Sequence, residues 1–402
     1  MIKRRINGAA AAAAFLISAT FGGAASAGCQ KEATFDAWLA GVKKEAASDG
    51  VSQATIATAL AGVQFDPGIV AKDRAQGVFA QTFLQFSDRM VAGYRLKQGA
   101  ANIAKYKPVF DRIEKQYGVP APVITAFWGL ETDFGANIGS GPTLVSLATL
   151  AYDCRRPDTF RPELIDALKV IDRGDLRPEE MRGPWAGELG QLQFLPSHYF
   201  NYGVDFDGNG RVDLLHSAAD ALASAANMLA SFGWKRGQPW LQEVRVPQEL
   251  PWDQADLAIK LPRSQWAAWG VTYAGGKPLP ADAVKASLLL PMGRNGPAFL
   301  SYPNFDVYLQ WNSSLVYSTT AAYFATRLSG AGPVGRGDGG AGASIADIKA
   351  VQRLLAERGY DVGKVDGIVG LQTRAAIKDM QIKLGLPADS YPSKELLAKL
   401  GG

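Results

Sequence analysis

The sequence predicts a mainly α-helical protein of the α+β class, with a large helical domain, a small strand-containing part and a short C-terminal module. Apolar residues recur every three or four positions between Phe35 and about Ile171, as in Phe79, Phe83 and Phe86, which is typical of packed helices. Between about 242 and 311 this pattern gives way to prolines, glycines and short apolar runs, which favours a β-rich subdomain. A glycine-rich stretch then separates off the tail.

The N-terminus has the features of a secretory signal peptide over residues 1–27. Three basic residues precede a small apolar run, Ala9 to Phe21, and the small residues Ala25 to Ala27 provide a cleavage pattern. The apolar run is too short to span a bilayer comfortably, and no later stretch approaches the roughly 20 apolar residues of a membrane helix. We therefore expect cleavage near Ala27, export and no transmembrane segment.

Two cysteines, Cys29 and Cys154, remain after that cleavage. In an oxidising compartment such a pair is more often a disulfide than two free thiols, so we predict a bond between them. Residues 26–29 also form a poor lipoprotein-like signal, which leaves lipidation of Cys29 as the alternative. The whole chain carries a net charge of +4, and because residues 1–27 hold three basic and no acidic residues, the mature charge is 4 − 3 = +1. This balance offers no argument for nucleic-acid binding.

Glu131 lies in the run Trp128 to Gly135, at the end of an apolar helix that Pro120 and Pro122 precede. We expect Gly135 to end this helix. The negative end of the helix dipole and the aromatic neighbours should both disfavour the ionised carboxylate. A carboxyl that stays protonated near neutral pH can donate its proton to a glycosidic oxygen, so Glu131 is the candidate general acid. An ordinary solvated helix-end carboxylate is the alternative.

Glycines alternate with aromatic and amide side chains between Gly183 and Tyr199. Gly187 and Gly190 permit a close approach of the backbone to a ligand, while Gln191 and Gln193 offer donors and acceptors that suit sugars. The alternative is a plain glycine-rich turn.

Oxygen-bearing residues at alternate positions form the first half of an EF-hand-like loop. The predicted ligands, for a structural calcium ion, are Asp205, Asp207, Asn209, Arg211 through its backbone carbonyl, and Asp220. His216 stands at the twelfth loop position in place of the usual glutamate, so Asp213 or Asp220 has to close the site. A simple surface turn is the alternative.

The sequence lacks the residue motifs that other common types of hydrolase require. The chain has two histidines, no HExxH motif, no paired cysteine ligands and no GxSxG elbow, so neither zinc nor serine hydrolysis is supported. Aromatic and amide residues gather near the end of the large domain, where they either line a saccharide groove or fill a core. This group consists of Tyr302, Asn304, Tyr308, Trp311 and Tyr317.

We expect a helix over 315–328 to close the large domain and residues 330–343 to form a flexible linker. The tail, 344–402, begins with Ser344 and Asp347 at capping-box spacing, and its apolar spacing predicts three amphipathic helices. A unit this small suits binding and leaves little room for an enclosed active site.

Taken together, four segments in this order resemble the lytic transglycosylase B family of bacterial cell-wall enzymes, over roughly residues 33–328. The segments are WGLETDFG, AGELGQLQFLPSHY, VDFDGNGRVDL and the stretch from YPNF to TRL. The tail is similar to the peptidoglycan-binding domain of wall hydrolases. The resemblance divides the chain into a signal peptide (1–27), a catalytic domain (28–329, with its β-rich part at about 242–311), a linker (330–343) and a binding domain (344–402).

The resemblance implies a lysozyme-like helical core with an EF-hand-like calcium loop, and a monomeric periplasmic enzyme that acts on peptidoglycan glycan strands. Such an enzyme cleaves the β-1,4 bond between N-acetylmuramic acid and N-acetylglucosamine and leaves 1,6-anhydromuramic ends, with Glu131 as the sole catalytic acid and base and no cofactor for the chemistry. We expect substrate contacts from Gln193, Tyr199, Asn304, Trp311 and Tyr317.

Two other functions remain open at this point. A hydrolytic muramidase needs a second carboxylate, and Glu188 in the glycine-rich segment is the candidate. A wall-binding scaffold without activity would use the same cleft only to hold glycan.

Overall fold

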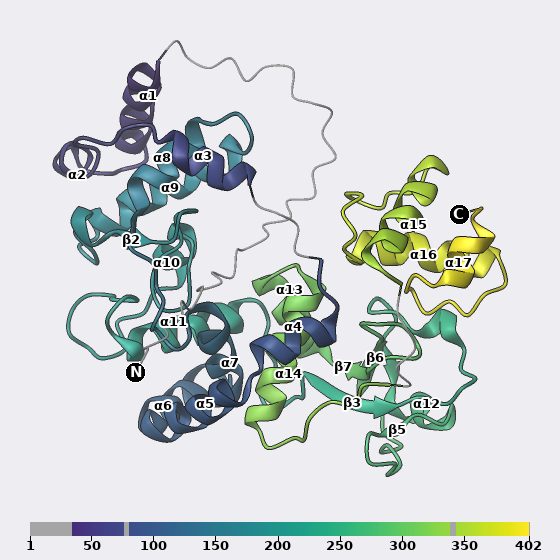
Figure 1. The fold of residues 1–402 in the computed structure, drawn as a ribbon. Coiled ribbons are helices and arrows are strands. Elements are labelled where there is room, and N and C mark those ends of the chain that lie inside the picture. The colour runs from purple at the N-terminus through teal and green to yellow at the C-terminus, as the bar shows by residue number, and fades with distance from the viewer. Residues whose placement is uncertain (1–33, 76–79, 338–342, 402) are drawn as a thin grey trace, which may run out of the picture. The chain divides into compact units, whose positions relative to one another are not determined.

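The computed structural model describes residues 34–75, 80–337 and 343–401 (Figure 1). The predicted signal peptide and Cys29 lie outside these residues. The described chain forms two compact units. The first contains the residues up to 75, 106–117 and 127–231, and the second contains 80–105, 118–126 and the chain from 232 onwards.

The first unit is almost entirely helical, and its centre is the packing of α8 on α9 and of α9 on α10. Two residue pairs, Gly141 opposite Gly183 and Pro142 opposite Arg182, form its short antiparallel ribbon. Its elements are α1 (Phe35–Ser48), α2 (Gln53–Ala59), α3 (Pro67–Arg74), α6 (Lys107–Tyr117), β1 (Gly141–Pro142), α8 (Thr143–Tyr152), α9 (Pro157–Asp172), η1 (Pro178–Glu180), β2 (Arg182–Gly183), α10 (Pro196–Tyr202) and α11 (Ala218–Ser231).

Local sequence signals start these helices. At α3, the Asp66 carboxylate accepts the N–H of Gly68 over 2.7 Å, and Pro67 occupies the first turn, where a missing N–H costs nothing. Helix α7 (Ala121–Thr132) begins after the Pro120 signal and leads from the second unit into the first, where it carries Glu131.

The second unit contains an antiparallel sheet of five strands in the order β4-β6-β7-β3-β5. Trp266 is fully buried under this sheet and donates its indole N–H to the carbonyl of Ala286 over 2.9 Å. The elements are α4 (Phe83–Met90), α5 (Gly93–Lys105), β3 (Leu241–Arg245), η2 (Trp252–Gln254), β4 (Leu261–Pro262), α12 (Arg263–Ala268), β5 (Thr272–Tyr273), β6 (Lys285–Leu289), β7 (Ala298–Ser301), α13 (Pro303–Trp311) and α14 (Leu315–Leu328).

The structure confirms the small sheet, and its strands cover a shorter range of residues than the predicted β-rich part. Strands begin at Leu241 and end at Ser301, whereas residues 303–311, expected within the β-rich part, form α13. Pro303 at the first turn of α13 favours a helix start at this point. The predicted helix over 315–328 is present as α14.

The tail folds into the three expected helices, α15 (Ile345–Glu357), α16 (Leu371–Lys383) and α17 (Lys394–Lys399). Ser344 and Asp347 form the predicted capping box. Val351, Leu355, Ile377 and Leu396 have no exposed surface and form the core of this module.

The first part of the predicted flexible linker is held by hydrogen bonds. The N–H of Gly335 donates to Glu243 over 2.7 Å, and Arg336 forms two bonds to the Asp88 carboxylate, of 2.9 and 3.2 Å. Glycine composition could not reveal these contacts, because the partners lie far away in the sequence. Residues 338–342 lie outside the described chain.

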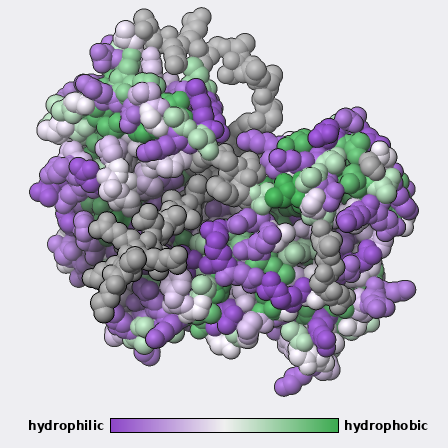
Figure 2. Space-filling view, in the orientation of Figure 1, coloured by the Kyte–Doolittle hydropathy of each residue, from purple (hydrophilic) through white to green (hydrophobic). Residues whose placement is uncertain are grey.

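None of the described helices is long and apolar enough to cross a membrane. On the face seen in Figure 2, hydrophilic residues predominate and hydrophobic residues gather in small groups. Among the most exposed large apolar side chains are Ile345 and Ile382 of the module, at 49% and 52%.

Candidate active site around Glu131

Glu131 occupies the last turn of α7 and is 6% exposed. Phe127, Trp128 and Leu130 on the same helix are at most 3% exposed, and the Trp128 ring packs edge-on against Phe134 with centroids 5.6 Å apart. The apolar setting that the sequence predicted for this carboxyl is therefore present.

The helix that carries Glu131 ends earlier than predicted. It stops at Thr132, and the next two residues, Asp133 and Phe134, take left-handed φ values of 51° and 63° before Gly135 at 86°. The N–H of Phe134 bonds to the carbonyl of Trp128 over 3.1 Å, which closes the helix. Two non-glycine residues in this region cost roughly 1–2 kcal/mol each, so the surrounding structure has to hold them there.

A hydrogen-bond network fixes this helix end to the glycine-rich segment. Trp128 donates its indole N–H to Gln191 Oε1 over 3.1 Å, and the Gln191 amide donates to the carbonyl of Leu215 over 3.2 Å. The Thr132 hydroxyl donates to the Gln191 carbonyl over 2.6 Å and accepts the N–H of Gly135 over 2.8 Å. Gln191, which the sequence suggested as a sugar contact, is thus a positioning residue.

Gly190 permits the close approach in this network. The φ angle of Gly190 is 76°, and a Cβ atom at this residue would lie 2.5 Å from the carbonyl oxygen of Leu214. The same oxygen accepts the N–H of Gln191 over 2.8 Å. Any side chain at this position would push the segment away from residue 214.

Gln193 is held in a strained conformation at the same loop. Its φ is 51°, and its amide donates to the Gly190 carbonyl over 2.8 Å, while the side chain is 8% exposed. Of the four non-glycine residues with left-handed φ in the described chain, three are Asp133, Phe134 and Gln193. Strain of this kind concentrates at functional sites.

Tyr199 is not available to a substrate. It has no exposed surface, its hydroxyl donates to the Val212 carbonyl over 2.8 Å, and it accepts the N–H of Leu214 over 3.2 Å. Burial raises the pKa of this phenol far above its ordinary value. The predicted substrate contact is therefore corrected to a core residue that holds the 212–214 loop in place.

Asn304 is also a structural residue. It lies in the second unit with no exposed surface, accepts the N–H of Lys235 over 2.6 Å and donates to the carbonyls of Lys235 and Gln238 over 2.9 Å each. Its hydrogen-bonding groups are used by the backbone, which corrects the predicted substrate contact. Trp311 and Tyr317 in the same unit are each 5% exposed, so their burial favours the core alternative.

Glu188 is buried, with 6% of its surface exposed, and burial raises its pKa to about 7. The charged side chains close enough to act on it are Arg156, which precedes α9, and Glu163 within α9. Glu163 in turn accepts the N–H and the hydroxyl of Ser197 over 2.9 and 2.8 Å. The Glu188 carboxyl therefore belongs to a buried polar cluster beside α9.

The predicted metal loop brings three carboxylates together. Ligand oxygens of Asp205, Asp207 and Asp220 lie within 4.8 Å of one another. Asp220 closes the group, whereas Asp213 instead accepts Arg211 over 2.7 Å and the backbone N–H groups of Leu215 and His216. Asn209 accepts the N–H of Arg211 within the loop over 3.1 Å. Hard oxygen donors on a tight turn fit a calcium ion.

Cys154 is disulfide-bonded in the structure. Its predicted partner, Cys29, lies outside the described residues, so the pairing stays a prediction.

Comparison with known proteins finds family matches for both the large helical part and the tail. A family profile described as Transglycosylase SLT domain matches residues 34–326, and one described as Putative peptidoglycan binding domain matches 344–400. The chain is 39% identical to SltB3 from Pseudomonas aeruginosa, solved in complex with NAG-anhNAM-pentapeptide, with a TM-score of 0.84 over 92% of this chain and 100% of that one.

More distant relatives match a part of the chain. Membrane-bound lytic murein transglycosylase B of Escherichia coli K12 is 30% identical over 237 residues, which are 59% of this chain and 64% of that protein, so the match spans less than two thirds of its length. Escherichia coli Slt35, solved in complex with calcium, is 26% identical with a TM-score of 0.61, over 72% of this chain and 92% of that one. With a family match over residues 34–326, which is more than half of its length, the chain belongs to the Transglycosylase SLT domain family.

Proposed function

We propose that this protein is a peptidoglycan lytic transglycosylase that cleaves the β-1,4 bond between N-acetylmuramic acid and N-acetylglucosamine and forms 1,6-anhydromuramic ends. The observation that carries the proposal is the buried Glu131 carboxyl, held at a strained helix end by Gln191 and Thr132. The family match and the ligand named for SltB3 support it.

In this mechanism Glu131 performs both proton transfers. In its protonated form, the Glu131 carboxyl donates to the leaving glycosidic oxygen. The C6 hydroxyl of the muramic acid then attacks C1 and gives its proton to the Glu131 carboxylate, which restores the acid. Because the nucleophile is part of the substrate, no second carboxylate is needed to activate water.

Glu188 has no role in this reaction. Its carboxyl is buried beside Arg156 and Glu163, and the glutamine variant described below distinguishes this reaction from muramidase hydrolysis. Gln193 stays the proposed substrate contact from the glycine-rich segment.

We further propose that Asp205, Asp207 and Asp220 hold a structural calcium ion, with Asn209 and the Arg211 carbonyl completing its ligands. The carboxylate group and the calcium complex of Slt35 support this. The ion supplies no step of the reaction and fixes the loop that leads into α11.

Residues 1–27 are proposed as a cleaved signal peptide, and the mature protein as a periplasmic monomer with a disulfide between Cys29 and Cys154. The proposed divisions are a catalytic domain over 28–329, a linker over 330–343 and a peptidoglycan-binding domain over 344–402, which the two family matches support.

Mass spectrometry of digested peptidoglycan tests the activity. The wild-type protein should release muropeptides with anhydromuramic ends, which are lighter by one water than hydrolytic products. Glu131→Gln should abolish release while the protein stays folded, and Glu188→Gln should retain it. Reducing muramic ends from the wild-type protein would instead establish a muramidase, and no release at all would favour a scaffold.

A further inference from the structure

The tail module, residues 344–401, packs against the sheet-bearing part of the second unit through specific polar contacts. Lys378 of α16 pairs with Asp256 over 2.7 Å, with the two side chains only 14% and 28% exposed. Asp389 accepts the N–H of Arg294, in the turn between β6 and β7, over 3.0 Å. Gly293 in this turn approaches so closely that a Cβ atom would lie 3.0 Å from Asp389.

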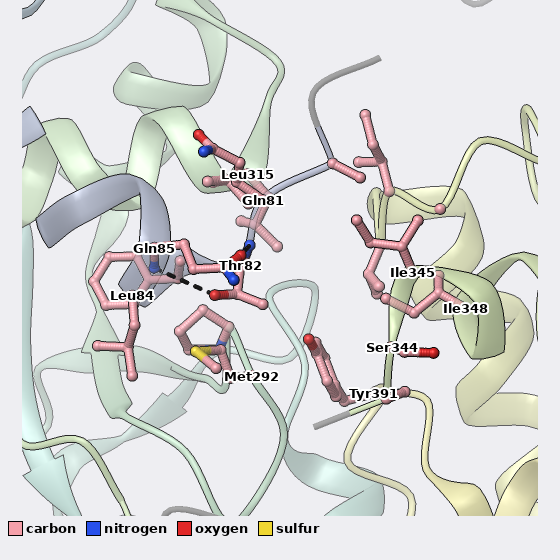
Figure 3. Close-up of a pocket in the computed structure, with 18 of the residues that line it drawn as sticks. Gln81, Thr82, Leu84, Gln85, Met292, Leu315, Ser344, Ile345, Ile348 and Tyr391 are labelled. Carbon is pink, nitrogen blue, oxygen red and sulfur yellow. Dashed lines mark hydrogen bonds between the residues drawn. The ribbon is translucent and has the colours of Figure 1, made fainter. Parts of the chain in front are cut away.

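These contacts place the module beside the start of α4 and enclose a pocket of about 430 Å³. Gln81, Gln85 and Met292 lie on one side of it, and Ile345, Ile348 and Tyr391 of the module lie on the other (Figure 3). Arg336 of the fixed linker segment also lines it. The volume is within the range of ordinary small-ligand sites.

Three polar side chains of this pocket, those of Gln81, Gln85 and Arg336, present hydrogen-bond donors. The side-chain oxygen of Gln81 accepts Arg89 over 2.8 Å, and that of Gln85 accepts the N–H of Thr82 over 3.0 Å, which leaves their NH₂ groups to be presented. Arg336 uses two N–H groups on Asp88 and has three more. A matching ligand is therefore rich in acceptors, such as carbonyl and carboxylate oxygens.

The apolar side chains that line the pocket suit a peptide ligand better than a sugar. The two aromatic residues among the pocket residues, Phe83 and Tyr391, are 0% and 7% exposed, so neither presents a broad ring face on which a sugar could stack. Ile345, in contrast, is 49% exposed and offers a branched aliphatic surface. Aliphatic walls with several donors suit a short peptide with methyl side chains and free carboxylates.

We propose that this pocket binds the peptide stem of peptidoglycan, at a site built jointly by the wall-binding module and the catalytic domain. The inference rests on the proposed function, because it takes peptidoglycan as the ligand. It assigns the module a role in reading the stem peptide from a fixed position, in addition to general attachment to the wall. Glu131 belongs to the other unit, so this site is distinct from the reacting centre.

Isothermal titration of the full-length Glu131→Gln protein with a free stem pentapeptide tests the proposal. In this background, Ile345→Trp fills the pocket, and Ile382→Trp is the matched control, because Ile382 is equally exposed on the same module but does not line the pocket. We expect Ile345→Trp to weaken pentapeptide binding at least tenfold and Ile382→Trp to leave it unchanged. A peptide-free N-acetylglucosamine tetramer should be unaffected by either change.

A charge swap provides a second readout. Asp256→Lys should repel Lys378, open the pocket and weaken pentapeptide binding, and adding Lys378→Asp should restore it. Equal pentapeptide affinity in all these variants would overturn the proposal, as would loss of tetramer binding in Ile345→Trp, which would indicate a sugar site. Release of anhydro products by the wild-type protein is measured separately, so failure of this site and failure of the proposed activity give different results.

Discussion

The indole N–H of Trp128 donates to the side-chain oxygen of Gln191 over 3.1 Å and so connects the helix of Glu131 to the glycine-rich loop. Trp128 lies one helical turn before Glu131. The orientation of the Glu131 carboxyl thus depends on an amide that lies 60 residues away in the sequence.

Gln191→Leu should lower both stability and turnover. It leaves the Trp128 N–H and the Leu215 carbonyl buried without their partner, which costs about 2–4 kcal/mol in the free energy of unfolding. We expect kcat to fall more than KM rises, because the change displaces the acid. Urea unfolding and steady-state kinetics measure the two effects, with the exposed Gln116→Leu as control. A double mutant with Trp128→Phe should lose less than the sum of the single losses.

Glu188→Gln should change the pH dependence of stability. The folded protein holds the Glu188 proton up to a pKa of about 7, whereas the unfolded chain loses it near the ordinary value of 4.5. Stability contributed by this group is therefore complete below about pH 4.5 and declines as pH rises to 7, by about 3 kcal/mol. The glutamine variant lacks this decline, so it should gain stability over the wild type at pH 8 compared with pH 5.

Denaturant unfolding at both pH values checks the Glu188 prediction. Glu179→Gln serves as control, since Glu179 is 63% exposed and lies on the surface nearby in the sequence. A stability difference between wild type and Glu188→Gln that is the same at pH 5 and pH 8 would contradict the assignment.

Removal of calcium should lower the melting temperature. An ion bound only by the folded form stabilises it by roughly 1–3 kcal/mol when calcium is present at 10 to 100 times its Kd. Differential scanning calorimetry with calcium and with a chelator measures this. Asp220→Asn should abolish the difference, whereas Asp36→Asn, on an exposed site of α1, should keep it. A wild-type melting temperature that does not respond to the chelator would exclude the ion.

Gln352→Leu should disrupt the module without changing the reaction. Gln352 is fully buried in α15, donates to the carbonyls of Lys364 and Ile368 over 3.0 Å each, and accepts the N–H of Gly367 over 2.8 Å. Leaving these groups unpaired costs roughly 2–4 kcal/mol. We expect weaker co-sedimentation with insoluble wall and unchanged anhydro products. Gln372→Leu, on the surface of the same module, should bind wall as the wild type does.

The features that could be predicted correctly from the sequence are those that depend on residues close together in the chain. The helix over 315–328 and the Ser344–Asp347 capping box are present as expected, because apolar spacing and capping are local. The aromatic setting of Glu131 follows from its own helix for the same reason.

What the sequence missed depends on distant partners. Asn304 and Gln191 have the side chains of sugar ligands, but backbone groups of residues 235–238 and 215 use their amides. Tyr199 is likewise used by the 212–214 loop. The early end of α7 could not be predicted either, because a left-handed Asp133 and Phe134 contradict local preference and persist only through tertiary contacts.

The left-handed pair after α7 has a consequence for protein engineering. Glycine adopts this conformation freely, so a selection for heat resistance should recover Asp133→Gly, with a gain in melting temperature. The same substitution would let the chain next to Glu131, the proposed proton donor, adopt several conformations, and kcat should fall. At this one position, a substitution that raises the thermal stability of the enzyme should therefore lower its catalytic rate.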